Sequence, residues 1–342
     1  MKKLLSVLCL LFGFLGLCSA EEEQRVLIIG NSYTFYNDLP QVLQALSAKS
    51  KNPLDVESYT AGAMSLRGCL DDPAHTKARQ LVESGHYDWL ILQDQSQTPA
   101  YKPEETMDSV RRWAQIAKKN GTKVMLFLTW AHASADGNKI SPLIAMQEQT
   151  STTYCKAAVE NNVKVAPVGE AWAAWYRKNP DKELHHKDMS HPNPMGTYLA
   201  ACVIHASISG KPVKAAGTLK IGKKTLMRLP KGTAKELQAV ANSTVKGFTA
   251  QKYLDKLAQQ DQALPSAAEI KAILHKGMKL DELTALTGKP IHQSSNDGRK
   301  TYQFRIRNAA ELVAYCNNAN VVENISICAP DKPVEIIDVS KL

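Results

Sequence analysis

The chain has 342 residues, a formal net charge of +9 and 22% charged residues, which is long enough for a catalytic domain and a smaller second domain. The seven cysteines are widely spaced, which excludes a compact zinc ribbon and a disulfide-dense mini-fold. The basic residues are densest around 220–231 and no nucleic-acid recognition motif accompanies them, so a solvated basic face is favoured over nucleic-acid binding. Contact with anionic envelope polymers or lipid headgroups stays open.

The first twenty residues predict an export signal. Lys2 and Lys3 precede an apolar run over 4–17, and small residues end the segment at Ala20. The run is shorter than the ~20 residues that a membrane-spanning helix needs. We expect cleavage after Ala20 and a periplasmic or secreted protein with no integral membrane segment. Cleavage lowers the net charge by two, to +7, and leaves five cysteines, so at least one lacks a partner within the chain.

Strand-like and helix-like segments alternate over residues 24–212, which predicts a parallel α/β sheet covered on both faces. The first strand, 26–29, is an unbroken run of apolar residues typical of a buried parallel strand. Further strands are expected at 54–59, 87–92, 123–129 and 163–168, and helices at 40–49, 73–84, 104–119, 143–161 and 194–208.

Beyond residue 212 the composition changes. Residues 213–262 predict a basic and helical extension or linker, and 263–342 a separate small α+β module. In that module we expect helices at 266–275 and 279–287, then strands near 291–295, 301–305, 311–316 and 320–328. A turn at 317–319 would place Cys316 opposite a residue near 320, which argues against a disulfide with Cys328. The other possible cysteine pairings stay open.

The ends of the predicted strands carry polar residues that can do chemistry. Ser32 follows the first strand and precedes a helix, so its hydroxyl lies where open α/β sheets bind ligands. The same position also fits a helix cap. Gly62 and Gln95 follow the second and third strands, at the same edge of a parallel sheet. The N–H groups of Ser32 and Gly62 and the Gln95 amide could therefore form an oxyanion hole.

Asp188 and His191 stand three residues apart on a loop before a helix. This spacing can place an imidazole beside an orienting carboxylate, as an activated serine requires. A solvated loop acid and loop histidine are the alternative interpretation.

These blocks resemble the SGNH/GDSL hydrolases in their order along the chain: Gly30-Asn31-Ser32, Gly62, Gln93-Asp94-Gln95, and Asp188-Met189-Ser190-His191-Pro192. The resemblance implies a flavodoxin-like α/β/α sandwich, with Ser32 as nucleophile, His191 as general base and Asp188 as its partner. It also implies Ser32, Gly62 and Gln95 as oxyanion donors. The sequence departs from the family's usual pattern with Asn31 in place of Asp, and with Gln95 in place of Asn.

Other residues are weaker candidates. Asn31, Gln93, Trp130 and His132 are expected near the pocket. Trp130, Trp172, Trp175 and Tyr198 could form a sugar-stacking wall or belong to the core. His185, His186, Asp188 and His191 cluster along the chain, but no zinc motif supports them and we expect no metal or other cofactor.

The segment 274–290 resembles the SmpA/OmlA-like module of envelope lipoproteins, through Gly277-Met278, Asp281-Glu282-Leu283, Leu286 and Gly288-Lys289-Pro290. That resemblance implies contact with an envelope partner.

The sequence thus predicts an exported serine ester hydrolase that removes acetyl or other short acyl groups, with an acylated carbohydrate as the preferred substrate. A lipase or thioesterase, and a non-catalytic envelope binding protein on the same fold, are the alternatives.

Overall fold

The computed structural model describes residues 23–133, 141–296, 299–308, 310–329 and 332–342. The predicted signal at 1–20 lies outside the described residues. Within these ranges no helix is long and apolar enough to span a bilayer.

A five-stranded parallel sheet forms the centre of the first domain, in the order β2-β1-β3-β4-β5. This order places β1, which precedes Ser32, between the strands that precede Gly62 and Gln95. The strands are β1 (Gln24–Gly30), β2 (Leu54–Thr60), β3 (Trp89–Leu92), β4 (Lys123–Phe127) and β5 (Lys164–Ala166).

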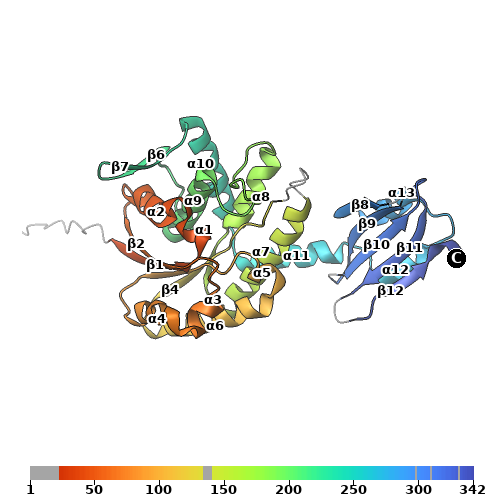
Figure 1. Cartoon of the computed structure of the whole chain (residues 1–342), viewed down its shortest axis with the longest axis horizontal. Helices are drawn as coiled ribbons and strands as arrows, with labels where there is room; N and C mark the ends of the chain where they lie inside the picture. Colours follow the sequence, from red (N-terminus) through yellow and green to blue (C-terminus); the bar gives the residue numbers. More distant parts are fainter. Residues whose placement is uncertain (1–22, 134–140, 297–298, 309, 330–331) are drawn as a thin grey trace, which may run out of the picture.

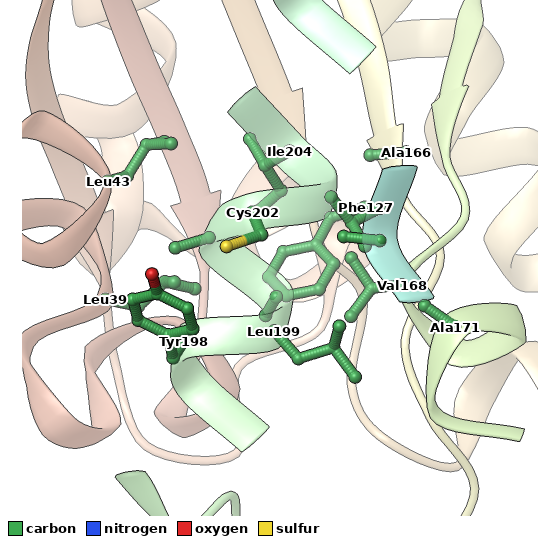
Figure 2. Close-up of a cluster of buried hydrophobic side chains, with 14 of the residues drawn as sticks. Leu39, Leu43, Phe127, Ala166, Val168, Ala171, Tyr198, Leu199, Cys202 and Ile204 are labelled. Atoms are coloured by element: carbon green, nitrogen blue, oxygen red, sulfur yellow. The ribbon is translucent and has the colours of Figure 1, made fainter. Parts of the chain in front are cut away.

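Helices cover both faces of the sheet, as Figure 1 shows. Because successive strand residues point to opposite faces, Val26 and Ile28 belong to one core, and Leu27 and Ile29 to the other. Figure 2 shows the first core, where Leu199 and Cys202 lie near Phe127 and Val168. The helices of this domain are α1 (Ser32–Phe35), α2 (Leu39–Ser47), α3 (Leu66–Asp71), α4 (Thr76–Glu83), α5 (Thr98–Tyr101), α6 (Pro103–Lys119), α7 (Ser141–Asn161), α8 (Val168–Lys178) and α9 (Pro194–Ser209), with short 3-10 turns at Tyr36–Asp38 and Pro73–His75.

The segment after α9 packs on the α/β domain. It forms a hairpin of β6 (Thr218–Ile221) and β7 (Lys224–Arg228), then α10 (Lys231–Val245) and α11 (Ala250–Gln262). Leu237 and Ala241 of α10 join the first core, and Tyr253 of α11 packs against the second. The sequence predicted a basic and helical extension over 213–262. The structure divides it around Gly247, whose φ of +75° is not helical.

The C-terminal module has its own core and an antiparallel sheet in the order β12-β11-β10-β9-β8. A side-chain capping box at Ser266 and Glu269 starts its first helix, near the predicted start at 266. Cys316 lies opposite Val322 in the sheet register, and all five cysteines in the described part of the chain are free thiols. The elements are α12 (Ala267–Ile273), α13 (Leu280–Thr287), β8 (His292–Asn296), β9 (Arg299–Ile306), β10 (Ala310–Cys316), β11 (Val322–Cys328), β12 (Glu335–Asp338) and a final 3-10 turn at Val339–Lys341.

The predicted fold class is confirmed: an α/β/α sandwich with a parallel sheet, followed by a small α+β domain.

Candidate active site

Ser32 is the first residue of α1 and lies two residues after Gly30, the end of β1. The Asn31 side chain caps this helix by accepting a hydrogen bond from the backbone N–H of Tyr33 (3.1 Å). Gly30 allows the tight turn, because a Cβ there would lie 2.5 Å from both Gln93 Oε1 and Thr34 Oγ1. Asn31 therefore caps the helix, and the Ser32 hydroxyl is not used for capping.

Two buried amides hold the turn against the neighbouring strands. Gln93 Oε1 accepts from the Asn31 backbone N–H (2.9 Å) and from Thr34 Oγ1 (2.8 Å). Asn31 Nδ2 donates to the carbonyl oxygens of Met64 (2.9 Å) and Asp94 (3.3 Å). Asn31 and Gln93 are 2% and 0% exposed. The prediction that Asn31 and Gln93 lie along the pocket is therefore wrong. Both side-chain amides are buried behind the turn and supply its hydrogen bonds.

Ser32, His191 and Asp188 form one continuous hydrogen-bonded chain. His191 Nε2 lies 2.8 Å from Ser32 Oγ, and His191 Nδ1 lies 2.7 Å from Asp188 Oδ2. A carboxylate on Nδ1 favours the tautomer that carries its proton there, which leaves Nε2 free to accept the serine proton. The structure thus brings together three side chains from two loops that are 156 residues or more apart in sequence.

Asp188 is held as a carboxylate by its own loop. Its partial burial favours the neutral acid, but hydrogen bonds from the backbone N–H groups of Ser190 (3.0 Å) and His191 (2.9 Å), and from the His191 ring, outweigh this effect. The pKa of Asp188 therefore lies well below its usual range. Asp188 therefore stays negatively charged beside His191 and can stabilise its imidazolium form.

Aromatic rings and an amide fix the position of the His191 ring. Tyr36 stacks on it, with ring centroids 4.4 Å apart and planes 17° apart, and Tyr33 meets it edge-on at 5.8 Å. Asn37 Nδ2 donates to the Pro192 carbonyl (2.9 Å) and so ties the serine loop to the histidine loop. Asn37 and Asp38 both have positive φ angles, 52° and 56°, which non-glycine residues seldom adopt. These roles of Tyr33, Tyr36 and Asn37 were not predicted, although all three residues follow Ser32 within five positions.

Two of the three predicted oxyanion donors, Gly62 and Gln95, lie in the loops that follow β2 and β3. Gly62 is exposed, and a Cβ there would meet no atom within 4 Å among the described residues. Gln95 uses its Oε1 to accept from the N–H groups of Gln97 (2.8 Å) and Thr98 (3.1 Å), at the start of α5. This arrangement leaves the Nε2 group as donor, with Ser96 Oγ at 3.2 Å. Because β1 pairs with both β2 and β3 in parallel, both loops leave the sheet at the edge where Ser32 lies.

The tryptophans belong to the core. Trp130, Trp172, Trp175 and Tyr198 are each 0% exposed, so the alternative of a sugar-stacking wall is wrong, and Trp130 does not line an open pocket. Trp130 instead stacks on Tyr33 at 4.5 Å and donates from Nε1 to the Ser190 carbonyl (2.9 Å). Buried aromatic surface therefore supports the active-site loops from behind.

His132 is half-buried near His191. Its Nε2 lies 3.2 Å from Ser190 Oγ, which in turn lies 2.9 Å from the Tyr33 hydroxyl. Burial and the nearby His191 lower the pKa of His132. Ser190 was not singled out by the sequence, although it stands inside the Asp188–His191 block.

The described residues contain no group of three His, Cys, Asp or Glu side chains that could hold a metal ion. His185 uses both ring nitrogens elsewhere, with Nε2 2.9 Å from the Ala131 carbonyl and Nδ1 2.7 Å from the Tyr176 hydroxyl. His185 is therefore a structural residue behind the site.

Comparison with protein-family models and with curated proteins finds no match. Among solved structures, a DUF4886 family protein from Bacteroides uniformis is 17% identical and has a TM-score of 0.52, with 66% of this chain and 95% of that chain covered. The α/β domain has the fold of that protein. A candidate SGNH hydrolase from Slackia heliotrinireducens is 25% identical (TM-score 0.48; 55% of this chain and 100% of that chain). An acetyl xylan esterase is 16% identical (TM-score 0.45; 54% and 99%).

The α/β/α sandwich that the resemblance to the SGNH/GDSL hydrolases implies is therefore confirmed as a fold. The resemblance of the C-terminal module to the SmpA/OmlA-like module stays a prediction.

Proposed function

We propose that the α/β domain is a serine ester hydrolase with Ser32 as its nucleophile. The observation that carries this proposal is the continuous chain from Ser32 Oγ through His191 to Asp188, with both hydrogen bonds under 3 Å. A serine hydroxyl is a weak nucleophile by itself, and a base oriented by a third group is the arrangement that activates it.

In the first half of the proposed reaction, Ser32 Oγ attacks the ester carbonyl as His191 Nε2 takes the serine proton. The C–O bond to the alcohol then breaks, and His191 returns the proton to the departing alkoxide. In the second half, water attacks the acyl-enzyme, gives a proton to His191 and releases the acid, and the proton returns to Ser32. Asp188 stays ionised and stabilises the imidazolium that forms twice in each cycle.

In each of the two tetrahedral intermediates the former carbonyl oxygen carries a negative charge, which hydrogen-bond donors must stabilise. We assign them to the Ser32 N–H, the Gly62 N–H and the Gln95 Nε2 group. The Ser32 N–H lies at the amino end of α1, where the first amides of a helix have no helical partner. Removing one oxyanion donor typically costs ~10²–10³-fold in kcat.

The proposed substrate class is a short acyl ester on a carbohydrate, met outside the cytoplasm after removal of the signal. The proposal draws on the predicted export and on an open site: the side chains of His191 and Asp188 are 27% and 39% exposed. A base that is partly exposed can reach an ester on a bulky chain without a deep pocket. The C-terminal module would then contact an envelope partner.

The test uses protein that begins at Glu21 and p-nitrophenyl acetate as the ester. Ser32→Ala should lower kcat/KM by at least ~10³-fold, because it removes the nucleophile, while Ser84→Ala, a matched change on an exposed turn, should leave it unchanged. Equal slow turnover by the wild type and Ser32→Ala would contradict the enzyme proposal and favour a binding protein. Acetylated sugars, short acyl esters and lysolipids then compare substrate classes. A preference for lysolipid over acetylated sugar would overturn the carbohydrate assignment alone.

A further inference from the structure

A second concave site lies at the opposite edge of the sheet from Ser32. It is a pocket of about 340 Å³ where β1 and β2 begin and α2 and α9 end, with Gln24, Leu54 and Ile208 in its wall. Gln24 and Gly30 are the two ends of β1. At roughly 3.3 Å per residue, about 20 Å separates this pocket from the catalytic edge. The pocket is therefore separate from the triad.

Four lysines line this pocket: Lys49, Lys51, Lys211 and Lys214. All four are exposed, and none forms an ion pair with a residue in the described ranges. The lining has no acidic side chain among the described residues. Four uncompensated positive charges around one hollow repel one another, and a bound anion would relieve that repulsion.

Helix ends account for only part of this charge. Lys49 lies two residues beyond α2 and Lys211 two beyond α9, where a cation is favoured by the carboxyl end of a helix. That effect is confined to about the last turn. Lys51 and Lys214 lie further along the connecting segments, so the helix ends do not explain why all four line one pocket.

His205 adds a second, independent sign of a ligand. Its ring lines the pocket, is 7% exposed, and has no hydrogen-bond partner for Nδ1 or Nε2 among the described residues. Buried polar atoms are nearly always paired. Burial lowers the pKa of this histidine and so favours the neutral ring, in which one nitrogen keeps a hydrogen that it can donate to an anionic oxygen. Both ring nitrogens are buried, so the ring must turn towards the pocket to make that hydrogen bond.

We propose that this pocket binds a phosphate group, held by the four lysines and by a hydrogen bond from His205. Phosphate fits because lysine ammonium groups bind it as point charges and its several oxygens can accept from more than one side chain. The group is carried either by a free phosphate compound or by the headgroup of an anionic lipid. The pocket would hold the protein on a phosphate-bearing ligand, while the edge of the sheet that carries Ser32 stays accessible to substrate.

The test measures binding of inorganic pyrophosphate by calorimetry to the chain that begins at Glu21, and co-sedimentation with phosphatidic acid vesicles against phosphatidylcholine vesicles. The Lys49→Ala/Lys211→Ala variant should weaken binding at least tenfold. Lys118→Ala/Lys119→Ala removes the same charge from exposed positions at the end of α6 and should change it less than twofold. Binding of pyrophosphate alone identifies a free phosphate compound, and binding of the acidic vesicles alone identifies a lipid headgroup; either supports the site.

Two further measurements separate a built site from general charge attraction. The pKa of His205, followed by NMR, should rise when the phosphate binds, because the bound anion favours the charged ring. Ser32→Ala should bind as the wild type does, since the triad lies at the other edge. No saturable binding in either arm, an equal loss in the two double-lysine variants, or an unchanged His205 pKa in the saturated protein would overturn the proposal.

Discussion

Asn31 stands where many SGNH/GDSL hydrolases, the family that the motifs resemble, have aspartate. The hydrogen bonds of Asn31 explain why an amide is present here. Its Nδ2 donates to two carbonyl oxygens, of Met64 and Asp94, while its Oδ1 accepts from the N–H of Tyr33 and from Gln93 Nε2. Aspartate keeps the two acceptor functions and loses both donors. In Asn31→Asp two buried carbonyls would therefore face a carboxylate.

The expected cost follows from these contacts. A buried group left without its partner costs ~1–3 kcal/mol, and a hydrogen bond to a charged group is stronger than its neutral counterpart by about 1 kcal/mol. At the middle of these ranges, two lost donors cost about 4 kcal/mol and two strengthened acceptors return about 2 kcal/mol, which gives a net destabilisation of about 2 kcal/mol. Because the same bonds hold the Ser32 turn, kcat should also fall.

Urea unfolding at pH 7, followed by tryptophan fluorescence, measures the free energy of unfolding. Asn162→Asp is the matched control, because it makes the same chemical change at an exposed residue, and it should stay within ~0.5 kcal/mol of wild type. An Asn31→Asp protein as stable and as active as the wild type would show that the two donated bonds do not hold the turn.

Three other changes test the neighbouring parts of the site. Asp188→Asn should lower kcat for p-nitrophenyl acetate on the order of 10³-fold with little change in KM, because it removes the charge that stabilises the His191 imidazolium; a loss under threefold would contradict this role. Burial holds the pKa of His185 at about 4, below the ordinary 6.5, so the unfolded chain takes up a proton before the folded protein does. The stability that this residue contributes is complete above pH 6.5 and is lost as the pH falls towards 4, by roughly 3 kcal/mol; urea midpoints that fall equally in wild type and His185→Gln would refute it. Gly30→Ala should destabilise by about 1–3 kcal/mol, because the new Cβ would overlap Gln93 Oε1 and Thr34 Oγ1, and an unchanged urea midpoint would show that the turn relaxes freely.

The parallel sheet could be predicted because its strands carry local signals. The run over 26–29 is apolar on both faces, as a strand covered on both sides must be. The shorter helices α3 and α5 could not be predicted this way, since four to six residues give no clear helical period. The helix α8 was not predicted, although Ala171, Trp172 and Trp175 recur at helical spacing on its buried face.

In the site, too, residues that belong to short motifs could be predicted, whereas contacts between distant loops could not. The order of motifs singled out Ser32, Asp188 and His191, and the structure brings their side chains into contact. The supporting contacts depend on how distant loops meet: Tyr36 stacks on a histidine 155 residues away, and Trp130 holds the Ser190 carbonyl. No periodicity or spacing encodes such contacts. The roles of Gln93 and Asn31 were misjudged for the same reason, because a polar residue at a strand end can point into the core as well as towards a ligand.

Covalent labelling tests the central claim most directly. A fluorophosphonate probe reacts with an activated serine, and mass spectrometry of the digested protein locates the adduct. We predict a single adduct on Ser32, absent from Ser32→Ala and strongly reduced in His191→Ala. An adduct on another serine, or equal labelling of Ser32 with and without the His191 imidazole, would contradict the triad.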